Sequence, residues 1–257
     1  MDGSVSYRWL RRSARRSNVA SRLICFPHAG AGASSFARWA VDAPAGMEIC
    51  SVQLPGREDV ADVPAATDLA ALLPALVDAI ASAGGDGLPF AFYGHSLGAA
   101  LACRAALTLS RSGHSPVRGL LVSGRRGPLL PRRGPPLEGL TDDELAATLA
   151  AAGGGSGELW RRPHWRQRYL DLIRNDLLAL ERMQPPPVRS LGIPVVAFHA
   201  AQDIWVSESE TAGWEDVTHG PFALRRIGGG HFDHHLARQK IMSEALALCH
   251  RRQDEMA

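Results

Sequence analysis

A serine with helix-forming residues after it stands at the centre of the pentapeptide GHSLG at positions 94–98. The apolar run Phe90–Tyr93 precedes this motif, and a segment rich in alanine begins at Ala99. Glycines on both sides of the serine allow the sharp strand-to-helix turn that presents a nucleophilic hydroxyl in front of a helix N-terminus. The alternative is an ordinary turn serine, but the strand before the motif and the helix after it favour the first interpretation. We therefore predict that Ser96 is a nucleophile.

A serine hydroxyl at neutral pH needs a general base, and the base needs a carboxylate that holds its tautomer. Asp203 follows the apolar run 195–198, and His231 follows the run 223–227 and three glycines. Both fit the order serine, acid, histidine that accompanies this type of turn. We expect Ser96, Asp203 and His231 to form a catalytic triad. The residues that could compete for the acid and base roles are Glu215, Asp216, His234 and His235.

A glycine-rich loop at 30–35 follows the apolar run Leu23–Phe26. It resembles a dinucleotide-binding loop, but Ser35 replaces the third glycine and no acidic residue ends the following strand. We therefore expect no cofactor here. The better role is an oxyanion loop, in which the backbone N–H groups of Ala29 and Leu97 converge on the substrate.

Metal binding is a further possibility, because three histidines and an aspartate lie close together at 231–235. Their spacing lacks the HExxH arrangement that places two ligands on one helical face, so we expect no metal. The cysteines are far apart, lie in apolar segments and show no CxxC or CxxH spacing. We expect buried thiols rather than a zinc site or a disulfide framework. They are Cys25, Cys50, Cys103 and Cys249.

Short apolar runs alternate with helical patterns, which predicts an α/β protein with a mostly parallel sheet covered by helices on both faces. The predicted strands are 23–26, 49–53, 89–93, 119–123, 195–198 and 223–227. The predicted helices are 69–80, with Asp68 as N-cap, 97–110 and 236–248. With 257 residues, 46% of them hydrophobic, the chain is expected to form one large domain at 21–250. A flexible basic leader at 1–20 and a tail at 251–257 complete the predicted organisation.

The composition changes over about 126–188. This segment begins with prolines and glycines, contains a capping-box pattern at Thr141 and Glu144, and breaks at Gly153–Gly157. A helix predicted around Tyr169–Met183 follows, and a run of prolines ends the segment. A helical insertion hinged by glycines is typical of a lid over an active site, although a peripheral helix pair is the alternative. We expect a lid, because long excursions in compact domains are usually functional.

Charge and hydropathy exclude several classes of partner. The net charge is 28 − 26 = +2, so no global basic excess indicates nucleic-acid binding. No apolar run approaches the roughly 18 residues of a membrane span. The N-terminus is rich in arginine, but no secretory apolar region follows it. We expect a cytoplasmic protein.

Five motifs in order carry a family resemblance: Phe26–Gly32, Gln53–Glu58, Gly94–Ala99, Ser123–Arg126 and Gly229–Phe232. Over about residues 20 to 245 the chain resembles the type II thioesterases of polyketide and nonribosomal peptide assembly lines. The resemblance implies an α/β-hydrolase that cleaves acyl thioesters from the phosphopantetheine arm of carrier proteins, through an acyl-enzyme, and so clears stalled or misprimed chains. It also implies the same triad and the same two oxyanion donors.

Some positions depart from the family pattern. Asp59-Val60 stand where an arginine is usual, Ile204 stands where a proline is usual, and Asp233–His235 replace apolar residues. These differences leave the proposed triad intact but alter the loop around His231.

Four arginines gather at the start of the predicted lid. Carrier proteins are usually acidic and bear a phosphodiester, so this arginine cluster could steer or clamp a carrier. The alternative is a solvated lid base, or an internal ion pair. The cluster comprises Arg125, Arg126, Arg132 and Arg133.

Two other functions fit the same triad or the same pocket. A small-molecule carboxylesterase or lipase would share the triad without needing motifs that face a carrier. A non-catalytic ligand-binding module would bind a ligand in the same pocket beside Ser96 without reaction at the serine.

Overall fold

A single mixed sheet forms the centre of the computed structural model, which describes residues 9–13, 18–110, 117–131, 133, 139–155 and 158–251. Within these residues seven strands follow the order β1-β3-β2-β4-β5-β6-β7. Every neighbouring pair is parallel except β1 and β3. The strands are β1 Leu10–Arg12, β2 Ser21–Phe26, β3 Met47–Val52, β4 Phe90–His95, β5 Val117–Ser123, β6 Val195–Ala200 and β7 Phe222–Ile227. The α/β class is confirmed, and the ends of the six predicted strands differ by no more than two residues.

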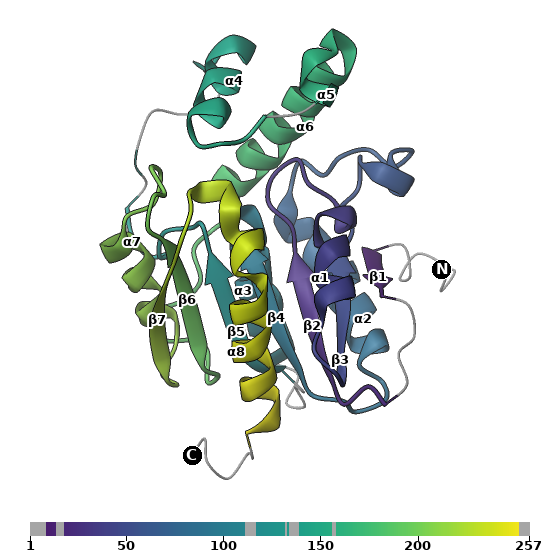
Figure 1. Cartoon of the computed structure of the whole chain (residues 1–257), viewed down its shortest axis with the longest axis vertical. Helices are drawn as coiled ribbons and strands as arrows, with labels where there is room; N and C mark the ends of the chain where they lie inside the picture. Colours follow the sequence, from purple (N-terminus) through teal and green to yellow (C-terminus); the bar gives the residue numbers. More distant parts are fainter. Residues whose placement is uncertain are drawn as a thin grey trace.

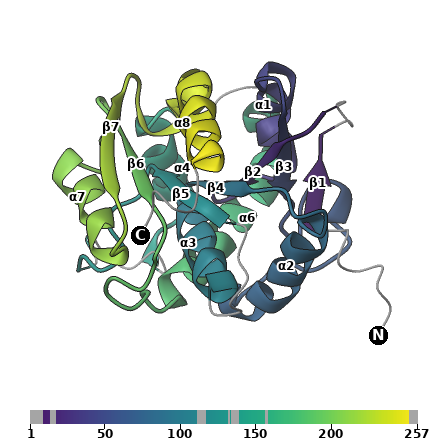
Figure 2. The same ribbon diagram turned by 90° about the horizontal axis from the view of Figure 1, so that it is seen from below.

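Helices cover both faces of the sheet (Figures 1 and 2): α1 and α8 pack on one face, and α2 and α3 on the other. Asp68 caps α2 as predicted, because its side chain accepts hydrogen bonds from the N–H groups of Ala70 and Ala71. The predicted helix 236–248 begins later, because His231–Ala237 forms a 3-10 helix. The helices are α1 Ala37–Asp42, α2 Leu69–Ala83, α3 Leu97–Ser110, α4 Asp142–Ala151, α5 Glu158–Arg161, α6 Pro163–Arg182, α7 Glu208–Ala212 and α8 Arg238–His250.

Apolar strand residues are buried on both sides of the sheet, so the core has two parts. One part joins the sheet to α2, α3 and α6, and the other joins it to α1 and α8. This burial is the main stabilising contribution to the fold, at about 25 cal/mol per Å² of apolar surface. None of the described helices is both long enough and apolar enough to cross a membrane.

The predicted flexible leader is partly wrong, because Leu10–Arg12 forms an edge strand on β3. Arg11 pairs with Asp59 at 2.6 Å, and Arg22, next to the leader, is buried and bonded to Glu48 at 2.8 Å. Both acidic partners lie more than 20 residues away in the sequence. The sequence near the arginines therefore contains no sign of these ion pairs, and the segment has the composition of a solvated leader. Apart from Arg251, the predicted tail lies outside the described residues.

The insertion between β5 and β6 has a projecting part and an embedded part. Helices α4 and α5 stand beyond the edge of the sheet (Figure 1), and the first residues of α6 are largely exposed. From Leu170 onward α6 is different, because Leu170, Ile173 and Ala179 belong to the core. The capping box at Thr141 and Glu144 is present as predicted. Movement of the insertion as a lid stays a prediction, and two residues of its predicted glycine hinge, 156 and 157, lie outside the described residues.

Candidate active site

Ser96 occupies the turn between β4 and α3 with φ = 53°, in a region that residues other than glycine rarely adopt. Its N–H donates to the carbonyl of Ser123 at 2.9 Å, and its carbonyl accepts from the N–H of Ala99 at 3.1 Å. A Cβ atom at Gly98 would lie 2.0 Å from the carbonyl oxygen of Phe26, so α3 packs directly on the end of β2. Such strain persists only where the surroundings fix it, and it accompanies functional sites. The predicted sharp turn is therefore present, and its backbone is strained at Ser96.

Asp203 and His231 meet at the same edge of the sheet. Asp203 follows β6 and His231 follows β7, and these strands are parallel and in register. Oδ2 of Asp203 lies 2.9 Å from Nδ1 of His231, and both side chains are buried. Oδ1 accepts from the N–H groups of Trp205 at 2.8 Å and Val206 at 3.1 Å. The carboxylate is thus held by hydrogen bonds on both oxygens.

These contacts also set the charge state of Asp203. Burial acts to raise the pKa of the carboxyl, but the hydrogen bond and charge of His231 outweigh it, with help from the two backbone N–H groups. The pKa therefore lies below its ordinary value, and Asp203 is ionised at neutral pH. An ionised carboxylate holds the proton of the imidazole on Nδ1 and leaves Nε2 as the acceptor.

His231 does not hydrogen-bond to Ser96 in this conformation. Its Nε2 atom is buried and has no hydrogen-bond partner among the described residues. The ring of His95, the residue before Ser96, lies 5.1 Å from the His231 ring. Catalytic hydrogen bonds are often long without substrate and shorten in the complex, so this arrangement is compatible with a base that acts on Ser96.

Three of the four competing residues are exposed and lie outside the hydrogen bond between Asp203 and His231. Glu215 and Asp216 have exposed side chains in the 3-10 helix Gly213–Val217. His235 is exposed, with Nδ1 near the carbonyl of Phe232 at 3.0 Å. The structure therefore brings together Asp203 and His231, and none of these three competing residues joins that hydrogen bond.

The predicted oxyanion donors leave neighbouring strands at one edge of the sheet. Phe26 of β2 is paired with Gly94 of β4, so the loop that contains Ala29 and the turn that contains Leu97 begin side by side. Both residues are buried. The contact between α3 and the end of β2 holds these two segments against each other.

A stack of histidines behind the site was not predicted as a unit. The rings of His95 and His234 are 3.9 Å apart and nearly parallel, and His28 lies edge-on to both. The hydroxyl of Tyr93 lies 2.9 Å from Nδ1 of His234 and 2.7 Å from Oγ of Ser123, which is 2.8 Å from Nδ1 of His95. His95 belongs to the serine motif, but nothing local in the sequence pairs it with His234, 139 residues later.

These three histidines are neutral at pH 7. Burial lowers the pKa of His28 to about 4, with smaller contributions from His231 and Arg57. Burial and the neighbouring rings also lower the pKa of His95 and of His234 well below the ordinary value.

We predict a steep loss of stability in mild acid. As pH falls below about 6.5, the unfolded chain protonates these three histidines while the folded chain does not. Each extra proton lowers the free energy of unfolding by about 1.4 kcal/mol per pH unit, so the slope should approach about 4 kcal/mol per pH unit. Urea unfolding between pH 7 and 5.5 measures this slope above the range in which unfolded carboxylates titrate. His234→Leu should make it shallower, and a flat profile would contradict the neutral stack.

The arginine cluster divides into paired and unpaired members. Arg126 and Arg133 both contact Glu210, at 3.3 and 3.0 Å. Arg125 has a buried Nε atom without a hydrogen-bond partner among the described residues, and burial lowers its pKa to about 10. Arg132 lies outside the described residues. Internal pairing therefore applies to two members, whereas Arg125 has no carboxylate partner in the described chain.

Arg125 lines a cavity of about 240 Å³ beside α3. Its other walls come from α3 and from the segments by which the insertion leaves and rejoins the sheet, including Leu130 and Met183. Arg104 also lines it, and none of the described lining residues is acidic. The cavity therefore has a positive charge without a counter-charge in its wall.

In the part of the chain that the structure describes, neither a cysteine nor a cluster of metal-binding side chains takes part in the hydrogen bonds of Asp203 and His231. The four cysteines are buried and free, as predicted. Burial raises the pKa of Cys103 to about 12, so that thiol is protonated at neutral pH. Among the described residues no group of three or more histidine, cysteine, aspartate or glutamate side chains could hold a metal ion.

The parallel sheet, the strained serine turn after β4 and the acid and histidine after later strands are those of an α/β-hydrolase. The chain belongs to the thioesterase family, because the model of the thioesterase domain matches residues 21–248.

Two similar proteins are thioesterases of Streptomyces species. A probable cadicidin biosynthesis thioesterase of Streptomyces griseus is 35% identical over 88% of this chain and 61% of its own length. Thioesterase PikA5 of Streptomyces venezuelae is also 35% identical, over 87% of this chain and 79% of its own length. This chain therefore spans less than two thirds of the first relative and more of the second.

Two solved structures with a similar fold are also thioesterases. The type II thioesterase BorB from the borrelidin biosynthetic cluster superposes with a TM-score of 0.82 and is 29% identical, with 97% of this chain and 99% of that chain covered. The RedJ thioesterase from the prodiginine pathway in Streptomyces coelicolor superposes with a TM-score of 0.81 and is 30% identical, with 92% and 94% covered.

Proposed function

We propose that this protein is a serine thioesterase that hydrolyses acyl thioesters on the phosphopantetheine arm of carrier proteins and so clears stalled or misprimed chains. The hydrogen bond between Asp203 and His231, at the sheet edge where strained Ser96 lies, carries the proposal. The family match supports a thioester as the bond that is cleaved.

The proposed reaction has two halves. Oγ of Ser96 attacks the thioester carbonyl while Nε2 of His231 takes the hydroxyl proton, and Asp203 stabilises the imidazolium that forms. The N–H groups of Ala29 and Leu97 donate to the oxyanion of the tetrahedral intermediate. Collapse breaks the carbon–sulfur bond, and His231 returns its proton to the departing thiolate. Water, activated by His231, then hydrolyses the acyl-Ser96 ester.

Two alternatives make different predictions. A carboxylesterase or lipase would use the same triad but prefer oxygen esters to carrier thioesters. A non-catalytic binding module would leave Ser96 unreactive, so covalent labelling by a fluorophosphonate separates it from an enzyme. The family match favours the thioesterase over both.

The partner is proposed to be an acidic carrier whose phosphodiester binds beside Arg125. This guanidinium has no carboxylate partner in the described chain and faces a cavity without acidic lining residues. A phosphodiester would supply the missing charge through hydrogen bonds assisted by charge. Arg132 and Arg133, at the start of the insertion, are proposed to steer the acidic carrier. The side chain of Arg133 is 75% exposed despite its contact with Glu210, so it can also face a partner.

We expect a higher kcat/KM for an acyl group on a carrier than for the same acyl group on a small thiol. The advantage should shrink with salt, because exposed charges are screened over about 10 Å at 0.1 M. Arg125→Ala should lower carrier kcat/KM about 10- to 100-fold, since hydrogen bonds to charged groups contribute about 1.5–3 kcal/mol. Arg132→Ala with Arg133→Ala should lower it less. Small-thioester hydrolysis should be nearly unchanged in both variants.

Steady-state kinetics on an acyl carrier, a matched small thioester and a matched oxygen ester test these expectations together. Arg38→Ala serves as the control, because Arg38 lies on α1 and its side chain is 78% exposed. Equal losses on the carrier and the small thioester would show that the arginines support the fold or the pocket. A preference for the oxygen ester would favour the esterase.

A further inference from the structure

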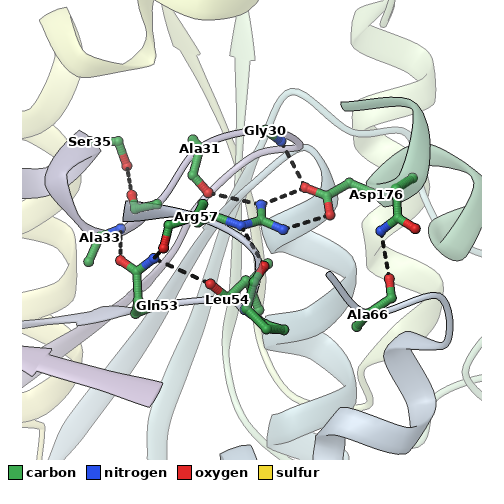
Figure 3. Close-up of polar contacts among 12 residues, drawn as sticks. Gly30, Ala31, Ala33, Ser35, Gln53, Leu54, Arg57, Ala66 and Asp176 are labelled. Atoms are coloured by element: carbon green, nitrogen blue, oxygen red, sulfur yellow. Dashed lines mark hydrogen bonds and ion pairs between the residues drawn. The ribbon is translucent and has the colours of Figure 1, made fainter. Parts of the chain in front are cut away.

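Helix α6 carries a buried carboxylate whose partners all lie outside the helix. Asp176 is 1% exposed, and Figure 3 shows both of its oxygens engaged. Oδ2 accepts from the N–H of Gly30 at 2.8 Å and from Nη1 of Arg57 at 2.6 Å, while Oδ1 accepts from Nη2 of Arg57 at 2.8 Å. Arg57 is 5% exposed, so the pair is dry and bidentate. The hydrolytic reaction described above uses neither residue.

Arg57 and its neighbour Gln53 hold the oxyanion loop from the other side. Arg57 also donates to the carbonyl of Ala31 at 3.2 Å. The side-chain oxygen of buried Gln53 accepts from the N–H of Ala33 at 2.8 Å, and its amide nitrogen donates to the carbonyl of Arg57 at 3.2 Å. Figure 3 shows these groups converging on one short stretch of chain. The loop is therefore attached at residues 30, 31 and 33 to two other segments.

Helix α6 contacts the oxyanion loop directly at Gly30. Its φ is +79°, and a Cβ atom there would lie 2.4 Å from Cγ1 of Ile173 on α6, so the helix packs directly on the loop backbone. The adjacent Asn175 donates to the carbonyl of Ala66 at 2.7 Å and fixes the helix to the chain on its other side. A shift of α6 would thus move Gly30, and with it the neighbouring Ala29.

We infer that the Arg57–Asp176 pair is a positioning device, which holds the N–H of Ala29 in place for the oxyanion and makes that placement depend on helix α6. The inference rests on the proposed function, in which Ala29 is an oxyanion donor. Stability alone does not require such a pair, because buried ion pairs can often be replaced by apolar side chains without loss. A carboxylate suits this position, because its two oxygens accept from both guanidinium nitrogens of Arg57 and from the N–H of Gly30 together.

The test replaces the whole pair, so that no buried charge is left unpaired. Arg57→Met with Asp176→Leu should stay folded but lose the acceptor for Gly30, and its Tm should fall by only a few degrees, because one buried N–H group is left without an acceptor. We expect kcat to fall about 10- to 100-fold, less than the 10²–10³ seen when an oxyanion donor is removed outright, with KM changed less than about two-fold. Arg57→Met with Asp176→Asn keeps an acceptor oxygen for Gly30 and should recover part of kcat.

A second measurement separates positioning from a structural role. An acyl trifluoromethyl ketone forms a tetrahedral adduct whose oxyanion needs the same donors. Its affinity should fall by the same factor as kcat in the Met/Leu variant, while a non-hydrolysable thioether analogue should bind as in the wild type. Arg22→Met with Glu48→Leu is the control, because that pair is equally buried but joins β2 to β3. Its further partners, Arg12 and Asp86, are about half exposed and stay solvated when the pair is replaced, so kcat should be unchanged.

Two results would overturn the inference. A folded Met/Leu variant with wild-type kcat and ketone affinity would contradict it, and so would a Met/Asn variant no more active than the Met/Leu variant. A wild-type protein that neither hydrolyses thioesters nor forms the ketone adduct would instead contradict the proposed function. These failures are therefore distinguishable.

Discussion

Replacement of Ser96 by alanine should reduce kcat by about 10⁴- to 10⁶-fold, because the members of a catalytic triad act as one unit. The variant should remain folded. Alanine keeps the backbone at φ = 53° as strained as it is with serine, and the contacts that fix this turn are made by backbone atoms and by the packing of α3 on β2. Steady-state kinetics with an acyl thioester, alongside thermal unfolding, measure both effects.

Two further variants sharpen this prediction. Ser190→Ala is the matched control, because the hydroxyl of Ser190 donates only to the carbonyl of Pro187 among the described residues, and it should keep full activity. Ser96→Gly should be more stable than Ser96→Ala by about 1 kcal/mol, since glycine adopts a positive φ without strain. Turnover near that of the wild type in Ser96→Ala would contradict the nucleophile assignment.

Asp203→Asn should reduce kcat by about 10³- to 10⁴-fold through the tautomer of His231. The two N–H groups of Trp205 and Val206 would keep the amide oxygen on their side, so the NH₂ group would face Nδ1 of His231. Nδ1 must then accept, and the proton moves to Nε2, which can no longer act as the base. The geometry should be preserved, because asparagine has the same shape as aspartate.

Asp216→Asn is the control for that substitution, because Asp216 lies on an exposed segment and was the competing acid. It should leave kcat unchanged. Kinetics of both variants over a pH range, with a crystal structure of Asp203→Asn, would check the explanation. An active Asp203→Asn and an inactive Asp216→Asn would show that the acid is misassigned.

Local patterns predicted the elements that depend on nearby residues. Asp68 caps α2 because its partners lie within three residues, and α3 runs over the predicted 97–110 because the serine motif determines where the helix begins. The six predicted strands are apolar enough to be recognised without their neighbours. The acid and the histidine were located from chain order, since each follows its own buried strand.

Contacts between distant residues could not be predicted in this way. The Arg57–Asp176 pair joins residues 119 positions apart, and Arg133 meets Glu210 across 77 positions. An arginine with a remote partner looks the same in sequence as a solvated one, so the arginine-rich pattern predicts a flexible leader where β1 forms. The histidine stack could not be predicted for the same reason. His95 and His234 are far apart in the sequence, and their rings come into contact only when the sheet forms.

The most direct test of the account is intact-protein mass spectrometry during turnover of an acyl carrier protein. The wild-type chain, quenched in acid within milliseconds, should carry one acyl group, and peptide mapping should locate it on Ser96. Ser96→Ala should carry none, and the free phosphopantetheine thiol of the carrier should appear together with the acyl-enzyme. Release of the acid with no acyl-enzyme, or an acyl group on a residue other than Ser96, would contradict a serine thioesterase.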